Sequence, residues 1–207
     1  MNEQTVMYIV RHGESEGNKK GLLLGHTDSV LTKNGESQAR KVCGEFKTIK
    51  FDAVLSSDLK RAVKTADILN LNKAIKIQKV QALRERYFGS LDGEPVEKLE
   101  IHFKDELQRL TTLPNEEKMN FKLVPDMETG NETAKRFISF LEKCYLKYKG
   151  KTILIVTHSS LMGNFLTYLT KRDYKGPTGA GGFEYLSYIK ILMNKNKIKI
   201  TETKGIS

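Results

Sequence analysis

The run Thr152-Ile-Leu-Ile-Val-Thr157 constrains the fold more than any other feature of the chain. It is an unbroken apolar stretch rich in β-branched residues, which is typical of a central parallel strand buried on both faces of a sheet. Parallel strands need crossover connections, and these are usually helices, so the run predicts a layered α/β architecture. Three further stretches have strand character, and they lie at residues 5–10, 51–55 and 75–80.

Helical periodicity fills the intervals between these strands. Apolar residues recur there at spacings of three and four, which places them on one face of a helix. The stripes are Ala39, Val42, Cys43 and Phe46 in a helix from about Asn34; Leu59, Ala62, Val63, Ala66 and Leu69, with Asp58 as predicted N-cap; Ala134, Phe137, Ile138, Leu141 and Tyr145 from about Asn131; and Leu161, Phe165, Leu166 and Leu169 after His158. The alternation predicts a three-layer αβα sandwich with a mostly parallel sheet.

Two regions depart from this alternation. Residues 184–192 and 197–203 flank a short polar segment, and this pattern predicts an antiparallel hairpin at the C-terminal edge of the sheet. Residues 90–130 are polar, carry most of the prolines and lack clear periodicity, so we expect a small insertion there that covers the active site. The length suits one hydrophobic core, and we expect a single domain over residues 1–207.

Polar segments follow the predicted parallel strands directly. They are Arg11-His12-Gly13-Glu14-Ser15, residues 56–62, residues 83–86 and Thr157-His158-Ser159. Because the carboxyl ends of parallel strands meet at one edge of an open α/β sheet, we expect these segments to form one ligand site. Gly13 has no Cβ and lets the backbone turn sharply and approach an anion.

The side chains of these segments suit a phosphoryl group. Arg11 and Arg61 each offer a planar fork of donors that matches phosphate, and two guanidiniums make the cluster unsuited to a metal cation. One of the histidines His12 and His158, kept neutral, can attack phosphorus, while the other, kept protonated, can stabilise the equatorial oxygens. Glu85 can donate a proton to the leaving oxygen, provided that burial raises its pKa.

Taken in order, these motifs resemble those of the histidine phosphatase superfamily, which includes the phosphoglycerate-mutase-like proteins. The opening signature is Arg11-His12-Gly13-Glu14-Ser15-x-x-Asn18, then Gly25-x-x-Asp28-x-x-Leu31-Thr32-x-x-Gly35-x-x-Gln38-Ala39. The later motifs are Ser57-x-Leu59-x-Arg61-Ala62-x-x-Thr65-Ala66, Leu83-x-Glu85-x-x-x-Gly89-x-Leu91-x-Gly93 and Val156-Thr157-His158.

The resemblance implies a phosphohistidine on His12 and Glu85 as the proton donor. It further implies a set of phosphate ligands, to which we add Ser159 for substrate binding: Arg11, Asn18, Arg61 and His158. Neither a metal nor an organic cofactor is expected. The expected partner is a small phosphorylated substrate, and we expect no binding of nucleic acid or membrane by a cytoplasmic monomer or homodimer.

Several positions differ from the mutases of this family. Ser159 stands where the mutases usually have Asn, Val96 where they have a lysine, and Leu24 where they have a small polar residue. Residues 101–125 contain only Arg109 where the mutases carry an arginine pair. These differences favour hydrolysis over mutase activity. The stretch Leu83-Arg84-Glu85-Arg86-Tyr87-Phe88-Gly89 is similar to sugar-bisphosphate phosphatases of the family, so the expected substrate is a sugar phosphate or bisphosphate. The alternatives are a 2,3-bisphosphoglycerate-dependent phosphoglycerate mutase and a phospho-ligand-binding regulatory module without turnover.

Other polar residues receive weaker roles. Gly130-Asn131-Glu132-Thr133 is matched to the Gly-Glu-Ser or Gly-Glu-Thr of family members, with one extra residue, and is predicted to begin a helix. Glu14 is interpreted as a residue behind the site that could orient an arginine. His26 and His102 belong to no motif and are predicted to be surface residues.

Composition limits the remaining possibilities. The formal net charge of +10 would suit nucleic acid, but the lysines are scattered without arginine-rich runs or interleaved aromatics, which indicates solvated helix faces. No stretch approaches the roughly 18 apolar residues that span a bilayer, and the N-terminus lacks the layout of a signal peptide. Cys43 and Cys144 lie in apolar stripes and are interpreted as reduced core residues.

Overall fold

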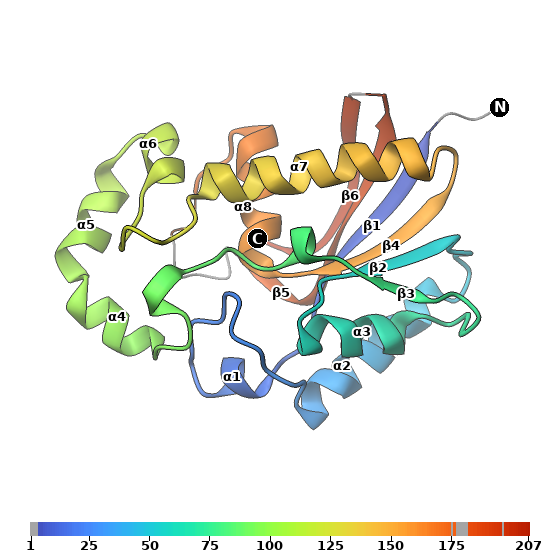
Figure 1. Ribbon diagram of the computed structural model, residues 1–207, viewed down its shortest axis with the longest axis horizontal. Coiled ribbons are helices and arrows are strands. Elements are labelled where there is room, and N and C mark those ends of the chain that lie inside the picture. Colours follow the sequence, from blue (N-terminus) through green and yellow to red (C-terminus); the bar gives the residue numbers. More distant parts are fainter. Residues whose placement is uncertain (1–3, 175, 177–181, 196) are drawn as a thin grey trace.

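A sheet of six strands forms the centre of the protein, in the order β3-β2-β4-β1-β5-β6 (Figure 1). The computed structural model describes residues 4–174, 176, 182–195 and 197–207. The strands are β1 (Thr5–Arg11), β2 (Ala53–Ser56), β3 (Ile77–Lys79), β4 (Thr152–Thr157), β5 (Phe183–Asn194) and β6 (Lys197–Ile206). Strands β1 to β4 run parallel, whereas β5 is antiparallel to β1 and β6 to β5. The predicted fold class, with its antiparallel C-terminal edge, is confirmed.

Strand β4 lies inside the sheet between β1 and β2, as its composition predicts. Its central residues from Ile153 to Val156 have no solvent exposure. Arg11 at the end of β1 is opposite Thr157 at the end of β4, and Ser56 at the end of β2 is opposite Val156. The carboxyl ends of β1, β2 and β4 are therefore aligned at one edge of the sheet.

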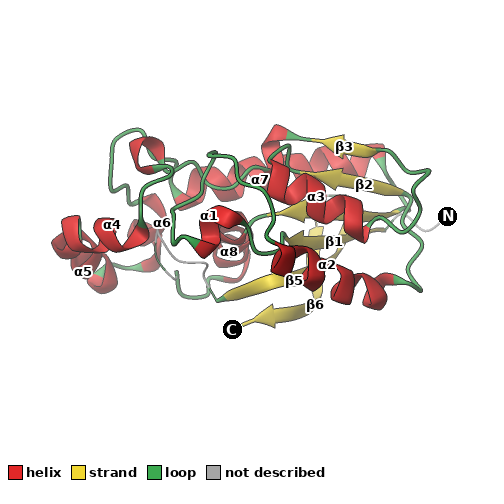
Figure 2. Cartoon of the chain, turned by 90° about the horizontal axis from the view of Figure 1, so that it is seen from below, coloured by secondary structure: helices red, strands yellow, loops and turns green. Residues whose placement is uncertain are grey.

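Helices cover both faces of this sheet (Figures 1 and 2). Helices α2 (Lys33–Cys43) and α3 (Lys60–Leu69) lie on one face, and α7 (Gly130–Lys147) and α8 (Ser159–Thr170) lie on the other. The two-residue period of β1 separates the two cores, because Met7 and Ile9 pack in the cluster of α7 and α8 while Tyr8 and Val10 pack in that of α2 and α3.

The segment predicted as an insertion is helical and lies at one end of the molecule (Figures 1 and 2). It contains α4 (Val96–His102), α5 (Lys104–Thr112) and α6 (Asn115–Asn120). An apolar cluster holds α4 against the loops that precede and follow it, and its buried members are Leu23, Phe88, Leu91, Leu99 and Met127. The remaining short elements are α1 (Glu16–Lys19) and the 3₁₀ turns Gly44–Phe46, Gln81–Leu83 and Gly89–Leu91.

Some predicted boundaries are wrong. Asp58 is not the N-cap of α3, which begins after Leu59, because its carboxylate instead accepts two hydrogen bonds from Arg84 at 2.8 and 2.7 Å. Phe46 lies beyond α2 in a 3₁₀ turn, although its side chain is buried as expected. Strand β5 continues to Asn194, so the turn of the hairpin is shorter than predicted; Asn196 lies outside the described residues. Among the described helices, none combines the length and apolar character that a bilayer span requires.

Candidate active site

The carboxyl ends of β1 and β4 open onto a small pocket. The predicted site residues Arg11, His12, Asn18, Glu85 and Ser159 line it. The cavity measures about 80 Å³, well below the roughly 300–1,000 Å³ of sites for drug-sized ligands. Two more predicted residues, Arg61 and His158, are fully buried beside it: the rings of His12 and His158 are 4.9 Å apart, and the charge of Arg61 acts on both. The structure therefore brings the predicted set together.

His12 begins the turn after β1, where its backbone N–H donates to the Thr157 carbonyl at 3.0 Å. Its Nδ1 lies 2.7 Å from the carbonyl oxygen of Gly13. Because a carbonyl only accepts, this contact assigns the proton of the neutral ring to Nδ1 and the lone pair to Nε2. Burial, followed by the charges of Arg61 and Arg11, lowers the pKa of His12 well below 6.5. The ring therefore has the protonation state of a nucleophile.

The turn after His12 requires glycine for close packing. A Cβ on Gly13 would lie 2.6 Å from the backbone oxygen of Gly35, and a Cβ on Gly35 would lie 2.1 Å from that of Glu14. The Gly13 N–H donates to Thr65 Oγ1 on α3 at 3.2 Å. Glu14 itself accepts from Thr32 Oγ1 at 2.6 Å and contacts neither arginine of the site by hydrogen bond or ion pair within the described residues. The turn is thus fixed against both α2 and α3.

His158 is fully buried, and neither of its ring nitrogens has a hydrogen-bond partner in the described part of the chain. Burial lowers its pKa well below 6.5, and the charge of Arg61 lowers it further. The protein's own groups thus oppose a charge on either histidine. A protonated histidine, as expected from the sequence, requires the negative charge of a bound phosphoryl group.

Arg11 is buried at the end of β1, and its Nη1 donates to the Phe183 carbonyl. The Tyr185 ring lies 4.3 Å from its Cζ, a cation–π contact that sequence reasoning did not anticipate. A shift of register and the positive φ of Leu186, 61°, mark a bulge in β5 at this point. Bulges often redirect a side chain beside an active site, and this one accounts for the position of Tyr185. Arg11 Nε has no described partner.

Arg61 lies in the first turn of α3 with no solvent exposure. Its Nη1 donates to the carbonyl of Thr27 at 2.9 Å, and its Nη2 donates to those of Gly25 and Leu24 at 2.9 and 3.3 Å. Burial lowers its pKa to about 10, so the guanidinium stays charged at neutral pH. Its Nε has no partner among the described residues. Arg61 therefore fixes the loop before α2 with both of its Nη atoms and leaves Nε–H without a described partner.

Glu85 is buried, and its carboxylate caps the first turn of α8. Oε1 accepts from the backbone N–H groups of Arg86 and Leu161 at 2.9 and 2.8 Å. Oε2 accepts from the Ser160 N–H at 3.0 Å and from Ser159 Oγ at 3.5 Å. Burial raises the pKa of Glu85 above 4.5, although these N–H donors oppose the shift. The pKa of Glu85 is therefore shifted in the direction that a proton donor requires.

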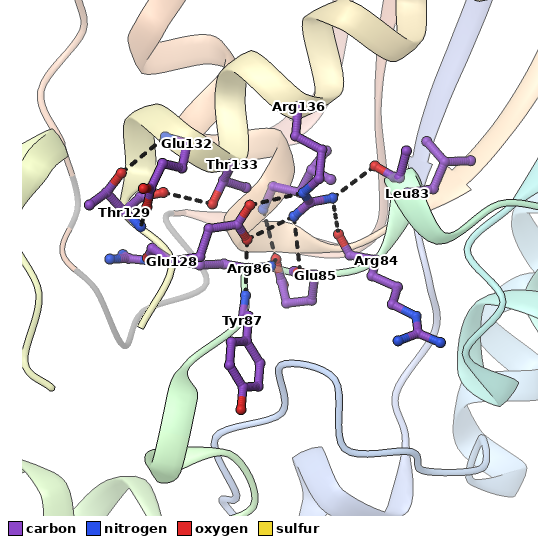
Figure 3. A network of polar contacts seen from close by, with 12 residues as sticks. Leu83, Arg84, Glu85, Arg86, Tyr87, Glu128, Thr129, Glu132, Thr133 and Arg136 are labelled. Carbon is purple, nitrogen blue, oxygen red and sulfur yellow. Dashed lines mark hydrogen bonds and ion pairs between the residues drawn. The ribbon is translucent and has the colours of Figure 1, made fainter. Parts of the chain in front are cut away.

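Arg136 and Glu128 hold the loop that carries Glu85, and the sequence analysis missed both (Figure 3). Their side chains form a two-bond ion pair, with Nε and Nη2 of Arg136 each 2.9 Å from an oxygen of Glu128. Arg136 also donates to three backbone carbonyls. These belong to Ala82, Arg84 and Glu85, at 2.8, 3.1 and 3.3 Å. In the sequence, the only sign of this ion pair is an acidic residue just before a predicted helix and an arginine within that helix.

The helix predicted to begin at Gly130-Asn131-Glu132-Thr133 is confirmed, since α7 starts at Gly130. Thr129 is the N-cap of α7 and forms a capping box with Glu132, whose carboxylate does not line the pocket. The Glu-Thr pair tied to the site is Glu128-Thr129, because Glu128 pairs with Arg136 and accepts from the Tyr87 N–H at 3.1 Å.

Of the minor predictions, the one for His26 is wrong. His26 is half-buried, and its Nε2 lies 3.1 Å from the backbone oxygen of Glu85. His102 is exposed, as predicted. Asn18 lines the pocket; its Oδ1 accepts from Ser15 Oγ at 2.8 Å and from Ser15 N–H at 3.3 Å, so its amino group is the donor left for a ligand.

The donor set fits an anion. The buried nitrogens without described partners at this site belong to Arg11, Arg61 and His158, and unsatisfied buried donors are costly unless a ligand accepts from them. Charged guanidinium groups do not coordinate metal cations. Within the residues that the structure describes, no group of three or more His, Cys, Asp or Glu side chains could hold a metal ion.

Comparison with known proteins agrees with this chemistry. Residues 7–204 match the model of the histidine phosphatase superfamily (branch 1). The uncharacterized phosphatase PhoE of Bacillus subtilis is 31% identical over 169 residues, which cover 82% of this chain and 79% of that protein. The probable phosphoglycerate mutase GpmB of Serratia proteamaculans is 31% identical over 165 residues, covering 76% and 71%. The YhfR structure from Bacillus stearothermophilus superposes with a TM-score of 0.81 at 20% identity over 98% of both chains and supports the fold.

Proposed function

The chain belongs to the histidine phosphatase superfamily, and we propose that it is a phosphatase that hydrolyses a small phosphorylated metabolite through a phosphohistidine on His12. One observation carries the proposal. Within the described residues, a neutral His12 whose Nε2 has no hydrogen-bond partner lies among buried, unpartnered nitrogens of Arg11, Arg61 and His158. This is the arrangement that a phosphoryl group in transfer requires, a nucleophile with positive charge around the equatorial oxygens.

The reaction proceeds in two balanced steps. His12 Nε2 attacks phosphorus and the bond from phosphorus to the ester oxygen breaks, while Glu85 gives its proton to the leaving alkoxide. The Glu85 carboxylate then takes a proton from a water molecule, which attacks the phosphohistidine and releases inorganic phosphate. Arg11, Arg61 and His158 neutralise the transferred group in both steps.

The apolar part of the pocket lining bears on the substrate. Among the described residues it consists of Leu22, Leu23, Leu24, Phe88 and Val96. A bisphosphate would place its second anionic group against these residues, among which the described lining offers no cation, at a large desolvation cost. Of the two expected types, a sugar phosphate or bisphosphate, the lining favours a compound with one phosphoryl group.

The same lining bears on the alternative of a phosphoglycerate mutase, which must grip a carboxylate and a second phosphate. Relatives named as mutases keep that alternative open to test. A coupled mutase assay primed with 2,3-bisphosphoglycerate separates the two activities, and we expect phosphate release to exceed mutase turnover. Failure to release phosphate from p-nitrophenyl phosphate and from a broad panel of metabolites would instead favour a regulatory module.

The decisive experiment is a screen of phosphorylated metabolites by release of inorganic phosphate, ranked by kcat/KM. With the best substrate, we expect His12→Ala to abolish both turnover and the phosphoenzyme trapped at alkaline pH. The matched control is His102→Ala, because His102 is an exposed histidine of α4. Normal turnover by His12→Ala would refute the nucleophile assignment. We also expect full activity in EDTA, and a requirement for an added divalent metal would contradict the anion-site argument.

A further inference from the structure

The half-buried ring of His26 contacts the peptide group of Glu85 from the loop that precedes α2. Its Nε2 lies 3.1 Å from the Glu85 carbonyl oxygen, so Nε2 carries the hydrogen and donates it. The backbone N–H of His26 donates to Asp92 Oδ2 at 2.6 Å. The ring also packs on Tyr87, with the centroids 5.0 Å apart. His26 is therefore held on both its backbone and its ring.

The Glu85 carbonyl receives a second donor from another element. Arg136 on α7 reaches it with Nη2 at 3.3 Å (Figure 3). The side-chain carboxylate of Glu85 accepts hydrogen bonds from the backbone of the first turn of α8. Three separate parts of the fold thus fix Glu85, and His26 is the part that comes from the phosphate side of the pocket.

The loop of His26 has little freedom to move. Arg61 donates to the carbonyls of Leu24, Gly25 and Thr27, on either side of His26. A Cβ on Gly25 would lie 2.1 Å from Asp92 Oδ1 and 2.7 Å from the backbone oxygen of Arg86, so the loop lies directly against the segment that follows Glu85. The bond from His26 to Glu85 therefore links the guanidinium of Arg61 to the proposed acid.

The ring has the proton arrangement that this bond requires. Burial lowers the pKa of His26, and the charges of Arg84 and Arg136 act in the same direction. The Glu85 carbonyl and the carboxylates of Asp92 and Asp58 oppose this shift. Because the bond needs a hydrogen on Nε2 alone, the neutral ring supplies it fully.

We propose that His26 is a positioning residue for proton transfer, which holds the backbone of Glu85 so that its carboxyl group reaches the leaving oxygen. The inference rests on the proposed function, in which Glu85 is the acid. His26 is not among the described residues that line the pocket. Its effect must therefore pass through Glu85 and must grow with the need for a proton on the leaving group.

The test compares leaving groups. His26→Phe keeps an aromatic ring against Tyr87 but removes the donor, whereas His26→Gln keeps an amide donor of similar reach. We measure kcat/KM for p-nitrophenyl phosphate, whose leaving group needs little protonation, and for phenyl phosphate, whose leaving group needs more. We expect His26→Phe to lower kcat/KM for phenyl phosphate about tenfold, the rate equivalent of one lost hydrogen bond, and for p-nitrophenyl phosphate about twofold or less.

The conservative variant supplies the rescue. We expect His26→Gln to remain within about twofold of the wild type on both substrates, since an amide N–H replaces the ring N–H. His102→Phe is the matched control and should change neither value. Should His26→Phe fail to fold, His26→Asn replaces it, because its shorter amide does not reach the Glu85 carbonyl. An equal loss on both substrates, no loss on either, or the same deficit in His26→Gln would overturn the proposal.

Glu85→Gln serves as the benchmark and keeps the two proposals apart. We expect it to show the same leaving-group pattern with a larger amplitude, about 10² to 10⁴ for phenyl phosphate. If Glu85→Gln lacks the pattern, the assignment of the acid fails, and the role of His26 fails with it. If Glu85→Gln shows the pattern and His26→Phe does not, only the positioning role is refuted.

Discussion

We expect the two buried histidines to make the protein sensitive to mild acid. His12 and His158 are 3% and 0% exposed, and burial, followed by the charge of Arg61, lowers both pKa values well below 6.5. In the unfolded chain each ring titrates near its ordinary value of about 6.5. Below that pH the unfolded state binds protons that the folded state refuses, so the free energy of unfolding falls as the pH falls toward the folded pKa values.

The magnitude follows from proton linkage. Each histidine that is protonated only in the unfolded state removes about 1.4 kcal/mol of stability per pH unit, so the pair removes about 2.8 kcal/mol per unit well below pH 6.5. Glu85 acts in the opposite sense. Burial raises its folded pKa above 4.5, so its proton favours the folded state as the pH falls through that folded value. The difference in this slope between the wild type and a histidine variant therefore reports the contribution of that histidine better than the wild-type slope alone does.

The assay is urea unfolding followed by circular dichroism at pH 7.5, 6.5 and 5.5. We expect His158→Gln to reduce the slope of stability against pH by about 1.4 kcal/mol per unit at the acid end, and His102→Gln to leave it unchanged. Saturating inorganic phosphate should flatten the wild-type slope, because its negative charge raises the pKa of both rings. An equal slope in wild type and His158→Gln would refute the claim that the site holds its histidines neutral.

Three further predictions concern packing, the loop of Glu85 and specificity. Gly35→Ala should cost about 1–3 kcal/mol in urea unfolding, because the new Cβ would lie 2.1 Å from the backbone oxygen of Glu14; unchanged stability would contradict this. Glu128→Gln should cost about 2 kcal/mol, less than the roughly 3–5 of a fully buried pair, since the Glu128 and Arg136 side chains are 16% and 26% exposed; a loss below about 0.5 would show that the pair is peripheral. Val96→Lys should raise kcat/KM for 3-phosphoglycerate relative to p-nitrophenyl phosphate roughly tenfold, and an unchanged ratio would place the carboxylate elsewhere.

The sequence predicts most of the sheet because its central strands β1, β2 and β4 are buried on both faces. The bounds of β4, Thr152–Thr157, agree with the apolar run. A strand that is buried on both faces appears in the sequence as a continuous apolar run, so the ends of the run mark the ends of the strand. The meeting of the site residues follows from the parallel arrangement of these strands. Residues at the ends of parallel neighbours must meet at one edge, and Arg11, His12 and His158 do.

The support around Glu85 could not be predicted from the sequence in the same way. Arg136 binds backbone carbonyls more than fifty residues earlier in the chain, and every residue of the chain has a carbonyl. No complementary side chain therefore marks the contact in the sequence. Glu128 and His26 resemble ordinary solvated residues for the same reason. Their roles depend on which loops lie beside each other, which tertiary packing decides.

Backbone carbonyls also explain how the site keeps its reactive nitrogens in place. His12 donates Nδ1–H to Gly13 and keeps Nε2, while Arg61 donates its Nη groups to the loop before α2 and keeps Nε. In both cases the nitrogens bound to carbonyls set the orientation and leave another nitrogen of the same group without a partner among the described residues. A carbonyl cannot be removed by changing a side chain, so truncating a neighbouring side chain does not delete these bonds. The positions of nucleophile and cation should therefore tolerate changes in the surrounding side chains, whereas that of Glu85, which also relies on the side chains of His26 and Arg136, should not.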